Sequence, residues 1–261
     1  MRPLSLSADK RMRIISSISK RKLIIEKEAG YFSLSGHGCI EVKDTSEFGA
    51  PVRLLLVNGV RESAAYLIPG LQYEPVFGYI RVLLDIFEHK NHLKTALLIG
   101  GAGFSLPKAF ISRYGDKSMD VVENNPDMID IAKKYFFLNR LIEEFELEKN
   151  KRMQIIIGDG CEYLENGDKE YDIIINDAFV GSIPDKGLMS KEGQKLINKR
   201  LTKGGIYVIN VIASLIGKDS APLMELGQTL SSVFGNVRIR QVSEDYPAEL
   251  KQNVIVISEK G

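Results

Sequence analysis

The chain has 261 residues, of which 44% are hydrophobic and 26% are charged, and its formal net charge is +1. A chain of this length can bury one large core or two unequal ones, as soluble globular proteins do. The small net charge argues against nucleic acid as the main partner, because no strong overall field attracts phosphate groups. Cys39 and Cys161 are too few for a disulfide framework, and together with three scattered histidines they predict no metal centre.

The chain also lacks sequence signals for a membrane. No apolar run approaches the roughly 18 residues of a membrane-spanning helix, and the start has no apolar signal-peptide core. We therefore expect a cytoplasmic protein without a membrane partner. The basic stretch over residues 10–22 is interpreted as a solvated tail or strand edge rather than a docking patch.

The first part of the chain predicts a small antiparallel β module, residues 1–70. Three short runs have the composition of strands, residues 22–28, 39–43 and 52–57. Residues 33–38 and 44–49 between them are rich in turn formers. A helix over residues 74–88 then joins this module to the rest of the chain, because its apolar residues recur at helical spacing.

A nucleotide site is indicated by the next two apolar runs. Residues 95–99 predict a buried strand that ends on Gly100-Gly101-Ala102-Gly103, where a backbone without Cβ atoms can turn sharply beside a ligand. Glu123 follows 23 residues after Gly100, behind the apolar run 119–122. A carboxylate at the end of that second strand can accept both ribose hydroxyls.

Two more strands end on carboxylates. Residues 153–157 lead into Gly158-Asp159-Gly160, and residues 171–175 lead into Asn176-Asp177. Ligand groups of open parallel sheets gather at the carboxyl ends of the strands, so Gly100, Glu123, Asp159 and Asp177 should converge on one crevice. Asp159 between two glycines could also simply make a turn.

The C-terminal part specifies the kind of sheet. A strand over residues 206–212 and a helix over 223–233 precede two strands, 237–242 and 254–257. The gap between these last strands is too short for a parallel crossover, so they should pair antiparallel. We expect an α/β fold over residues 71–261, a Rossmann-like, doubly wound sheet of the class I AdoMet-methyltransferase type.

With its parts in this order, the chain resembles the spermidine synthase (polyamine aminopropyltransferase) family from about residue 54 to 210. The matching pieces are LLLVNGV at 54–60, LIGG at 98–101, VENNP at 122–126, IGDG at 157–160, YDIIIND at 171–177 and LTKGGI at 201–206. The resemblance implies that Glu123 binds the ribose of a sulfonium nucleoside and Asp159 its adenine amino group. It places Asp177 beside the reacting sulfonium, as base or orienting group.

The resemblance also implies the remaining site residues. Gly100, Gly101, Gly103 and Gly160 would let the donor approach the backbone. Glu62 stands where the family has Gln and is assigned to the donor. Tyr73-Glu74 aligns with the family's Tyr-His-Glu, which makes Tyr73 a second catalytic candidate, although Tyr73 and Tyr79 can also simply pack.

Departures from the family leave the reaction open. The family's glycine turn carries an Asp that holds the ammonium of decarboxylated AdoMet, but residues 101–105 contain no acid. The family's acidic loop Asp-Ser-Ser-Asp-Pro keeps only its first Asp, Asp177, and has Val180 in place of the second. Phe179 in this loop favours a flat or apolar acceptor.

Three hypotheses follow: aminopropyl-type alkyl transfer to a small amine, AdoMet-dependent methyl transfer, and nucleoside binding without turnover. The donor would be AdoMet or decarboxylated AdoMet, with no metal. We expect the protein to be a homodimer.

Overall fold

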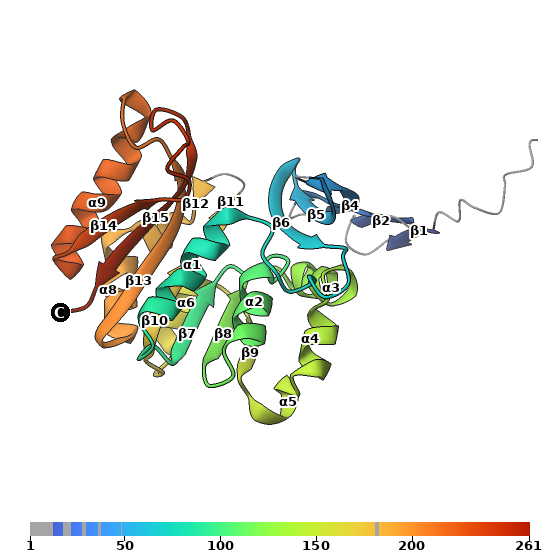
Figure 1. Cartoon of the computed structure of the whole chain (residues 1–261), viewed down its shortest axis with the longest axis horizontal. Coiled ribbons are helices and arrows are strands. Elements are labelled where there is room, and N and C mark those ends of the chain that lie inside the picture. The colour runs from blue at the N-terminus through green and yellow to red at the C-terminus, as the bar shows by residue number, and fades with distance from the viewer. Residues whose placement is uncertain (1–12, 18–21, 28–29, 36–37, 48, 181–182) are drawn as a thin grey trace, which may run out of the picture.

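The computed structural model describes residues 13–17, 22–27, 30–35, 38–47, 49–180 and 183–261. The strands within these residues form a six-stranded sheet, a seven-stranded sheet and a two-stranded ribbon. In Figure 1 the six-stranded sheet is the blue layer near α3, and the seven-stranded sheet lies between helices.

The N-terminal sheet is antiparallel, and each strand pairs with the next one in the chain. Its strands are β1 (Arg13–Ser17), β2 (Lys22–Lys27), β3 (Gly30–Ser35), β4 (Gly38–Glu47), β5 (Ala50–Val57) and β6 (Val60–Tyr66). The predicted antiparallel N-terminal sheet is therefore present over the described residues. The predicted basic tail at residues 10–12 and 18–21 lies outside the described residues.

Two segments predicted as turns belong largely to strands. Residues 33–35 lie in β3, and residues 44–47 extend β4. Asp44 faces Arg53 of β5 across the sheet, and the Arg53 guanidinium donates to both of its carboxylate oxygens at 2.7 and 2.9 Å. Polar residues on the solvent side of a strand resemble a turn in sequence, but their backbone is paired.

The helix α1 (Gly78–His89) begins later than the residue 74 predicted for it. Pro75 disfavours helical backbone at the preceding residue Glu74, and the N-cap Phe77 has extended backbone, so the helix starts only at Gly78. The predicted domain boundary at residue 70 falls between β6 and α1 and stays a proposal.

The seven-stranded sheet has the order β14-β15-β13-β10-β7-β8-β9. Its five parallel strands are joined by β15, which is antiparallel to both β13 and β14, as expected. The strands are β7 (Thr95–Ile99), β8 (Ser118–Glu123), β9 (Met153–Ile157), β10 (Tyr171–Asn176), β13 (Leu201–Ala213), β14 (Val237–Gln241) and β15 (Gln252–Glu259). A short ribbon of β11 (Phe179–Val180) and β12 (Ile183–Pro184) follows β10.

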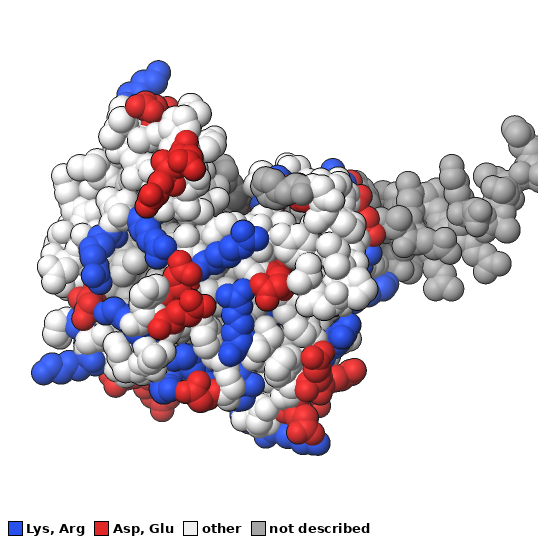
Figure 2. All heavy atoms as spheres, viewed as in Figure 1, with Lys and Arg blue, Asp and Glu red and all other residues white. Residues whose placement is uncertain are grey.

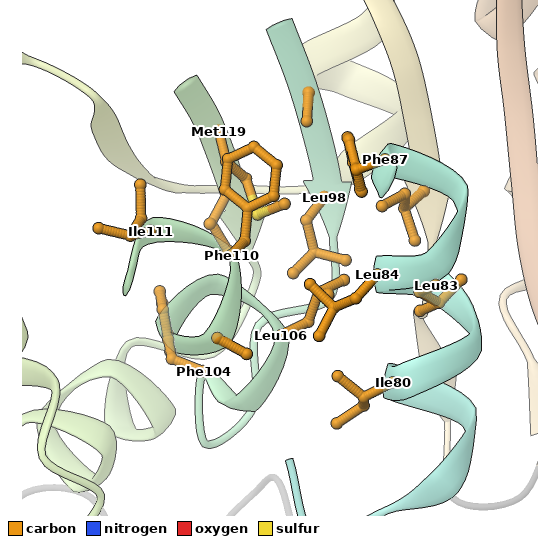
Figure 3. Packing of buried hydrophobic residues seen from close by; sticks show 14 of the residues in the cluster. Ile80, Leu83, Leu84, Phe87, Leu98, Phe104, Leu106, Phe110, Ile111 and Met119 are labelled. Carbon is orange, nitrogen blue, oxygen red and sulfur yellow. The ribbon is translucent and has the colours of Figure 1, made fainter. Parts of the chain in front are cut away.

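Helices cover both faces of this sheet. They are α2 (Ser105–Arg113), α3 (Pro126–Tyr135), α4 (Leu138–Glu144), α5 (Leu147–Asn150), α6 (Gly160–Asn166), α7 (Lys186–Met189), α8 (Lys191–Arg200), α9 (Ala221–Phe234) and the short 3-10 helix η1 (Lys218–Ser220). Strand residues alternate between two cores: Leu98 packs with α1 and α2, whereas Leu97 packs on the side of α6 and α8. Figure 3 shows Leu98 and Met119 meeting the apolar side chains of α1 and α2.

A third core joins the two sheets. Ile40 and Leu55 of the N-terminal sheet pack in one cluster with Ile131 of α3 and with Phe136. Gly103 also brings the sheets together, because a Cβ atom there would lie 2.6 Å from the Ser63 hydroxyl of β6. The N-terminal sheet is thereby held against the glycine turn.

Charge is distributed without a dominant sign on the face drawn in Figure 2, where acidic and basic side chains are interspersed. Among the described residues, no helix combines the length and the apolar character that crossing a membrane requires.

Candidate active site

The glycine turn after β7 is fastened by Glu123, the last residue of β8. One Glu123 carboxylate oxygen accepts the N–H groups of Gly101 and Ala102 at 2.8 and 3.0 Å, and the other accepts the N–H of Asn125 at 2.9 Å. Glu123 is only 6% exposed, so these charge-assisted bonds offset its burial. The carboxylate therefore shapes the turn in addition to lining the site.

Two of the predicted glycines are required by close contacts. Gly100 has φ +96°, and a Cβ atom there would lie 2.5 Å from the backbone oxygen of Asp177. A Cβ atom at Gly160 would lie 2.5 Å from the side chain of Ile99. The first contact joins the ends of the neighbouring strands β7 and β10, and the second lets the start of α6 approach the end of β7.

Asp159 serves as the N-cap of α6. Its carboxylate accepts the N–H of Glu162 at 3.0 Å, and the residue also lines a cavity. Capping accounts for an aspartate at this position on its own. Because Asp159 is exposed, its other carboxylate oxygen can also bind a ligand.

A cavity of about 520 Å³ opens at the carboxyl ends of the parallel strands. The structure brings Gly100, Glu123, Asp159 and Asp177 to its wall, together with Gly160 and Glu62. Gly101 lines a neighbouring cavity, and Gly103 packs against Ser63. The four strand ends that the sequence brought together thus share one hollow, which we call the nucleoside cavity after the ligand that the sequence predicts.

A second cavity of about 390 Å³ adjoins it. The residues that line both cavities are Glu62, Gly100, Ala102, Asp177 and Phe179. The second cavity continues toward α1 and the end of β13, and we call it the acceptor cavity after the amine acceptor that the sequence predicts. Two molecules bound in the two cavities would meet beside Glu62 and Asp177.

A bulge in β6 explains why Glu62 faces the site. Leu55 pairs with Ser63 and Leu56 with Arg61, so Glu62 is the additional residue between two registered pairs. Neighbouring strand residues normally point to opposite faces, but a bulge re-aims a side chain. Both Arg61 and Glu62 consequently line the acceptor cavity.

Asp177 is held by a chain of hydrogen bonds. The Tyr79 hydroxyl donates to one carboxylate oxygen at 3.0 Å, and the Asn210 amide donates to the other at 2.8 Å. Asn253 in turn donates to the Asn210 side-chain oxygen at 3.0 Å. These bonds fix the carboxylate at the junction of the cavities.

The structure does not bring Tyr73, the second catalytic candidate, to this junction. The Tyr73 hydroxyl donates to Glu144 of α4 at 2.9 Å, and its ring lies edge-on to Phe145, with 6.1 Å between the ring centroids. Because α1 begins only at Gly78, Tyr73 lies in the connection before the helix and faces α4. Tyr79, in the first turn of α1, is the tyrosine beside Asp177.

Asn210 and Asn253 were missed from the sequence. Asn210 had a signal: it is a polar residue inside the apolar run of β13 and is 3% exposed, where an unpaired amide would be costly. Asn253 lies near the start of a polar-to-apolar strand and gave no comparable signal.

Burial makes both junction carboxylates hard to ionise. It raises the pKa of Asp177 to about 6, against the lowering effect of the bonds from Asn210 and Tyr79. It raises the pKa of Glu62 to about 7, and the charges of Asp177 and Glu123 add to that rise. Of the two carboxyl groups, Asp177 therefore ionises at the lower pH. The described part of the chain contains no cluster of three or more His, Cys, Asp or Glu side chains suited to a metal ion.

The parallel sheet closed by the β15 pairing, with its cavity at the strand ends, defines a class I AdoMet-methyltransferase-like α/β protein. Residues 78–242 match the family model of the spermine/spermidine synthase domain. The chain belongs to this family.

A curated relative agrees with that membership. The chain is 30% identical over 182 residues to the polyamine aminopropyltransferase of Methanocaldococcus jannaschii, an alignment that covers 70% of this chain and 57% of the relative. The chain thus spans little more than half the length of this relative.

Two crystal structures show the same fold. A probable spermidine synthase from Corynebacterium glutamicum aligns with a TM-score of 0.69 at 18% identity, over 84% of this chain and 77% of that one. A spermidine synthase in complex with the transition-state analogue AdoDATO aligns with a TM-score of 0.65 at 20% identity, over 88% and 73%.

Proposed function

We propose that this protein is a transferase that moves an alkyl group of the aminopropyl type from a sulfonium nucleoside to an amine acceptor. The observation that carries the proposal is the position of Asp177 at the junction of two cavities, one at the strand ends and one beside it. Membership of the spermine/spermidine synthase family supports the same reaction class.

The nucleoside cavity fits a donor. A carboxylate offers about four acceptor sites, and backbone N–H groups use three of those on Glu123, which leaves about one for a ribose hydroxyl. Asp159 would meet the adenine amino group, as the resemblance implies. Gly100 and Gly160 keep side-chain atoms out of the strand ends where the donor would lie.

The chemistry requires a base. Free amines titrate near ~10, so the acceptor enters as an ammonium and must lose a proton before its nitrogen can attack. The nitrogen then forms a bond to the carbon next to the sulfonium, the carbon–sulfur bond breaks, and a neutral thioether nucleoside leaves. Asp177 accepts the proton, and its raised pKa makes it a stronger base than an ordinary aspartate.

The Asp177→Asn variant tests this role. We expect kcat to fall by about 10² to 10⁴-fold, because the amide accepts no proton, while methylthioadenosine still binds. The measurement is steady-state turnover with a panel of amines, together with calorimetry of the nucleoside.

Asp172→Asn is the matched control. Asp172 lies at the other end of β10, where it accepts bonds from Thr95 and Thr202. Its replacement should reduce stability and leave kcat of the folded protein unchanged. Full turnover by Asp177→Asn would contradict the assignment of the base.

Methyl transfer is the second candidate, and one observation favours it. Residues 101–105 of the glycine turn carry no acid to select the ammonium of decarboxylated AdoMet. Calorimetry with AdoMet, decarboxylated AdoMet and methylthioadenosine separates the two reactions. Tighter binding of AdoMet favours methyl transfer, and nucleoside binding without alkylation of any amine favours a protein without turnover.

Location and assembly remain predictions. We propose a cytoplasmic homodimer that acts on a small molecule and uses neither nucleic acid nor metal. Light scattering of the purified chain and cell fractionation measure the first two properties.

A further inference from the structure

The acceptor cavity contains an ion pair away from the reacting centre. Arg61 and Glu47 line this cavity but are absent from the lining of the nucleoside cavity, and their side chains form a salt bridge of 2.8 Å. The Arg61 guanidinium also lies over the Phe77 ring, 5.2 Å from its centroid. The arginine is thereby held between a carboxylate and an aromatic face.

This pair changes the charge that an acceptor meets. Among the described residues that line the acceptor cavity, the charged ones are Glu47, Arg61, Glu62 and Asp177. Arg61 neutralises Glu47, so the unbalanced negative charge lies with Glu62 and Asp177 at the junction. One ammonium finds a partner there, while a second ammonium farther along would meet a carboxylate that is already paired with a guanidinium.

The wall of this cavity is partly apolar, and its polar uncharged side chains are Ser63, Tyr79, Ser105, Asn210 and Asn253. Phe77, Phe179, Ile212 and Val242 contribute to the lining, and Phe179 stands at the junction itself. The apolar part favours the transfer of a hydrocarbon or aromatic body out of water, and the polar part carries no charge that would offset a second ammonium.

We infer that the acceptor is a monoamine with an apolar, flat body, and that the Arg61–Glu47 pair excludes diamines. This inference rests on the proposed function, because it takes the second cavity as the acceptor site. Arg61 is a specificity residue in this view: it occupies the carboxylate that would otherwise hold a distal ammonium.

The test measures amine binding to the protein saturated with methylthioadenosine, so it does not depend on turnover. Calorimetry compares phenethylamine with putrescine. We expect wild type to bind phenethylamine about tenfold or more tightly than putrescine, since a charge-assisted partner is missing for the second ammonium. Arg61→Gln should improve putrescine binding about tenfold, because Glu47 becomes free.

Two further variants make the result specific. The double variant Glu47→Gln with Arg61→Gln should lose the gain for putrescine, because no distal carboxylate remains. Arg238→Gln removes a surface arginine that pairs with Glu259 at 3.6 Å, and it should leave both affinities unchanged.

Contradicting results are equally defined. Putrescine binding as tight as phenethylamine binding in wild type would overturn the inference, as would an unchanged ratio in Arg61→Gln or no binding of either amine. Selective binding of phenethylamine without its alkylation would contradict the proposed transferase function and support the inferred amine selectivity. Alkylation of putrescine in preference to phenethylamine would support the transferase function and contradict the inferred selectivity.

Discussion

Glu62 and Asp177 approach the same point from different parts of the chain. Glu62 comes from a bulge in the N-terminal sheet, and Asp177 follows a strand of the seven-stranded sheet. Each carboxylate is desolvated, and the charge of Asp177 further raises the pKa of Glu62. Two coupled carboxylates of this kind readily hold one proton between them, which agrees with the proton transfer that we propose for this site.

The raised pKa of Glu62 predicts a pH-dependent stability. Its pKa is about 7 in the folded protein against 4.5 normally, so the folded state binds the proton more tightly than the unfolded state between these values. The contribution of Glu62 to the free energy of unfolding therefore falls as pH rises through this window. The free energy of unfolding of Glu62→Gln, relative to that of wild type, should therefore rise by about 1 to 3 kcal/mol from pH 5 to pH 8.

Urea denaturation at the two pH values measures this change. Glu148→Gln on the short helix α5 is the control, and its difference from wild type should be equal at both pH values. A Glu62→Gln difference that is also independent of pH would contradict the burial of this carboxyl group.

At the scale of elements, the starts of α3 and α1 differ in how well local sequence predicts them. Asn125 caps α3: its side chain accepts the N–H of Asp127 at 3.0 Å, and Pro126 begins the helix. The start of α1 was misplaced, because its apolar spacing extends back to Val76 although Phe77 is the N-cap. A capping residue marks the start of a helix locally. An apolar residue before the helix, such as Val76, can instead pack in another core and be counted as helical by mistake.

Replacement of this cap should affect stability more than function. Asn125→Ala should lower the free energy of unfolding by about 1 kcal/mol, because the first turn of α3 loses its side-chain acceptor. The backbone N–H of Asn125 that binds Glu123 is retained, so methylthioadenosine affinity should change little. Chemical denaturation and calorimetry measure the two effects.

Lys195→Ala on the exposed side of α8 is the control and should change neither quantity. Strongly reduced nucleoside binding in Asn125→Ala would show that the capping side chain is needed by the ligand itself.

At the scale of the whole molecule, α3 connects the two sheets. Ile131 and Met128 pack with residues of β4 and β5, and Met128 also lines the nucleoside cavity. The N-terminal sheet closes this cavity with Gly38, Val57 and Asn58. Packing between the sheets is therefore part of the site.

Loosening this packing should weaken nucleoside binding from a distance. Ile131→Ala should cost about 2 to 5 kcal/mol of stability, raise hydrogen exchange in β4 and β5, and weaken methylthioadenosine binding. Leu230→Ala in the core under α9 should cost a similar amount, because Leu230 is also fully buried. The Leu230→Ala variant should leave hydrogen exchange in β4 and β5 and the affinity for methylthioadenosine unchanged. Equal affinities for both variants would contradict coupling between the sheets.

The amino-acid sequence by itself determined the main sheet and most of the nucleoside wall. Alternating apolar runs, the glycine turn and the cap of α3 are local patterns, and parallel strands necessarily bring Gly100, Glu123, Asp159 and Asp177 to one edge. The antiparallel pairing of β14 with β15 followed from the short gap between these two strands.

Only the tertiary structure decided which side chains surround Asp177. Tyr79 rather than Tyr73 contacts it because α1 starts after Pro75, and Asn210 reaches it from the neighbouring strand. Arg61 and Glu62 face the same cavity because β6 has a bulge. Such contacts depend on register and on the packing of distant elements, which local sequence patterns do not encode.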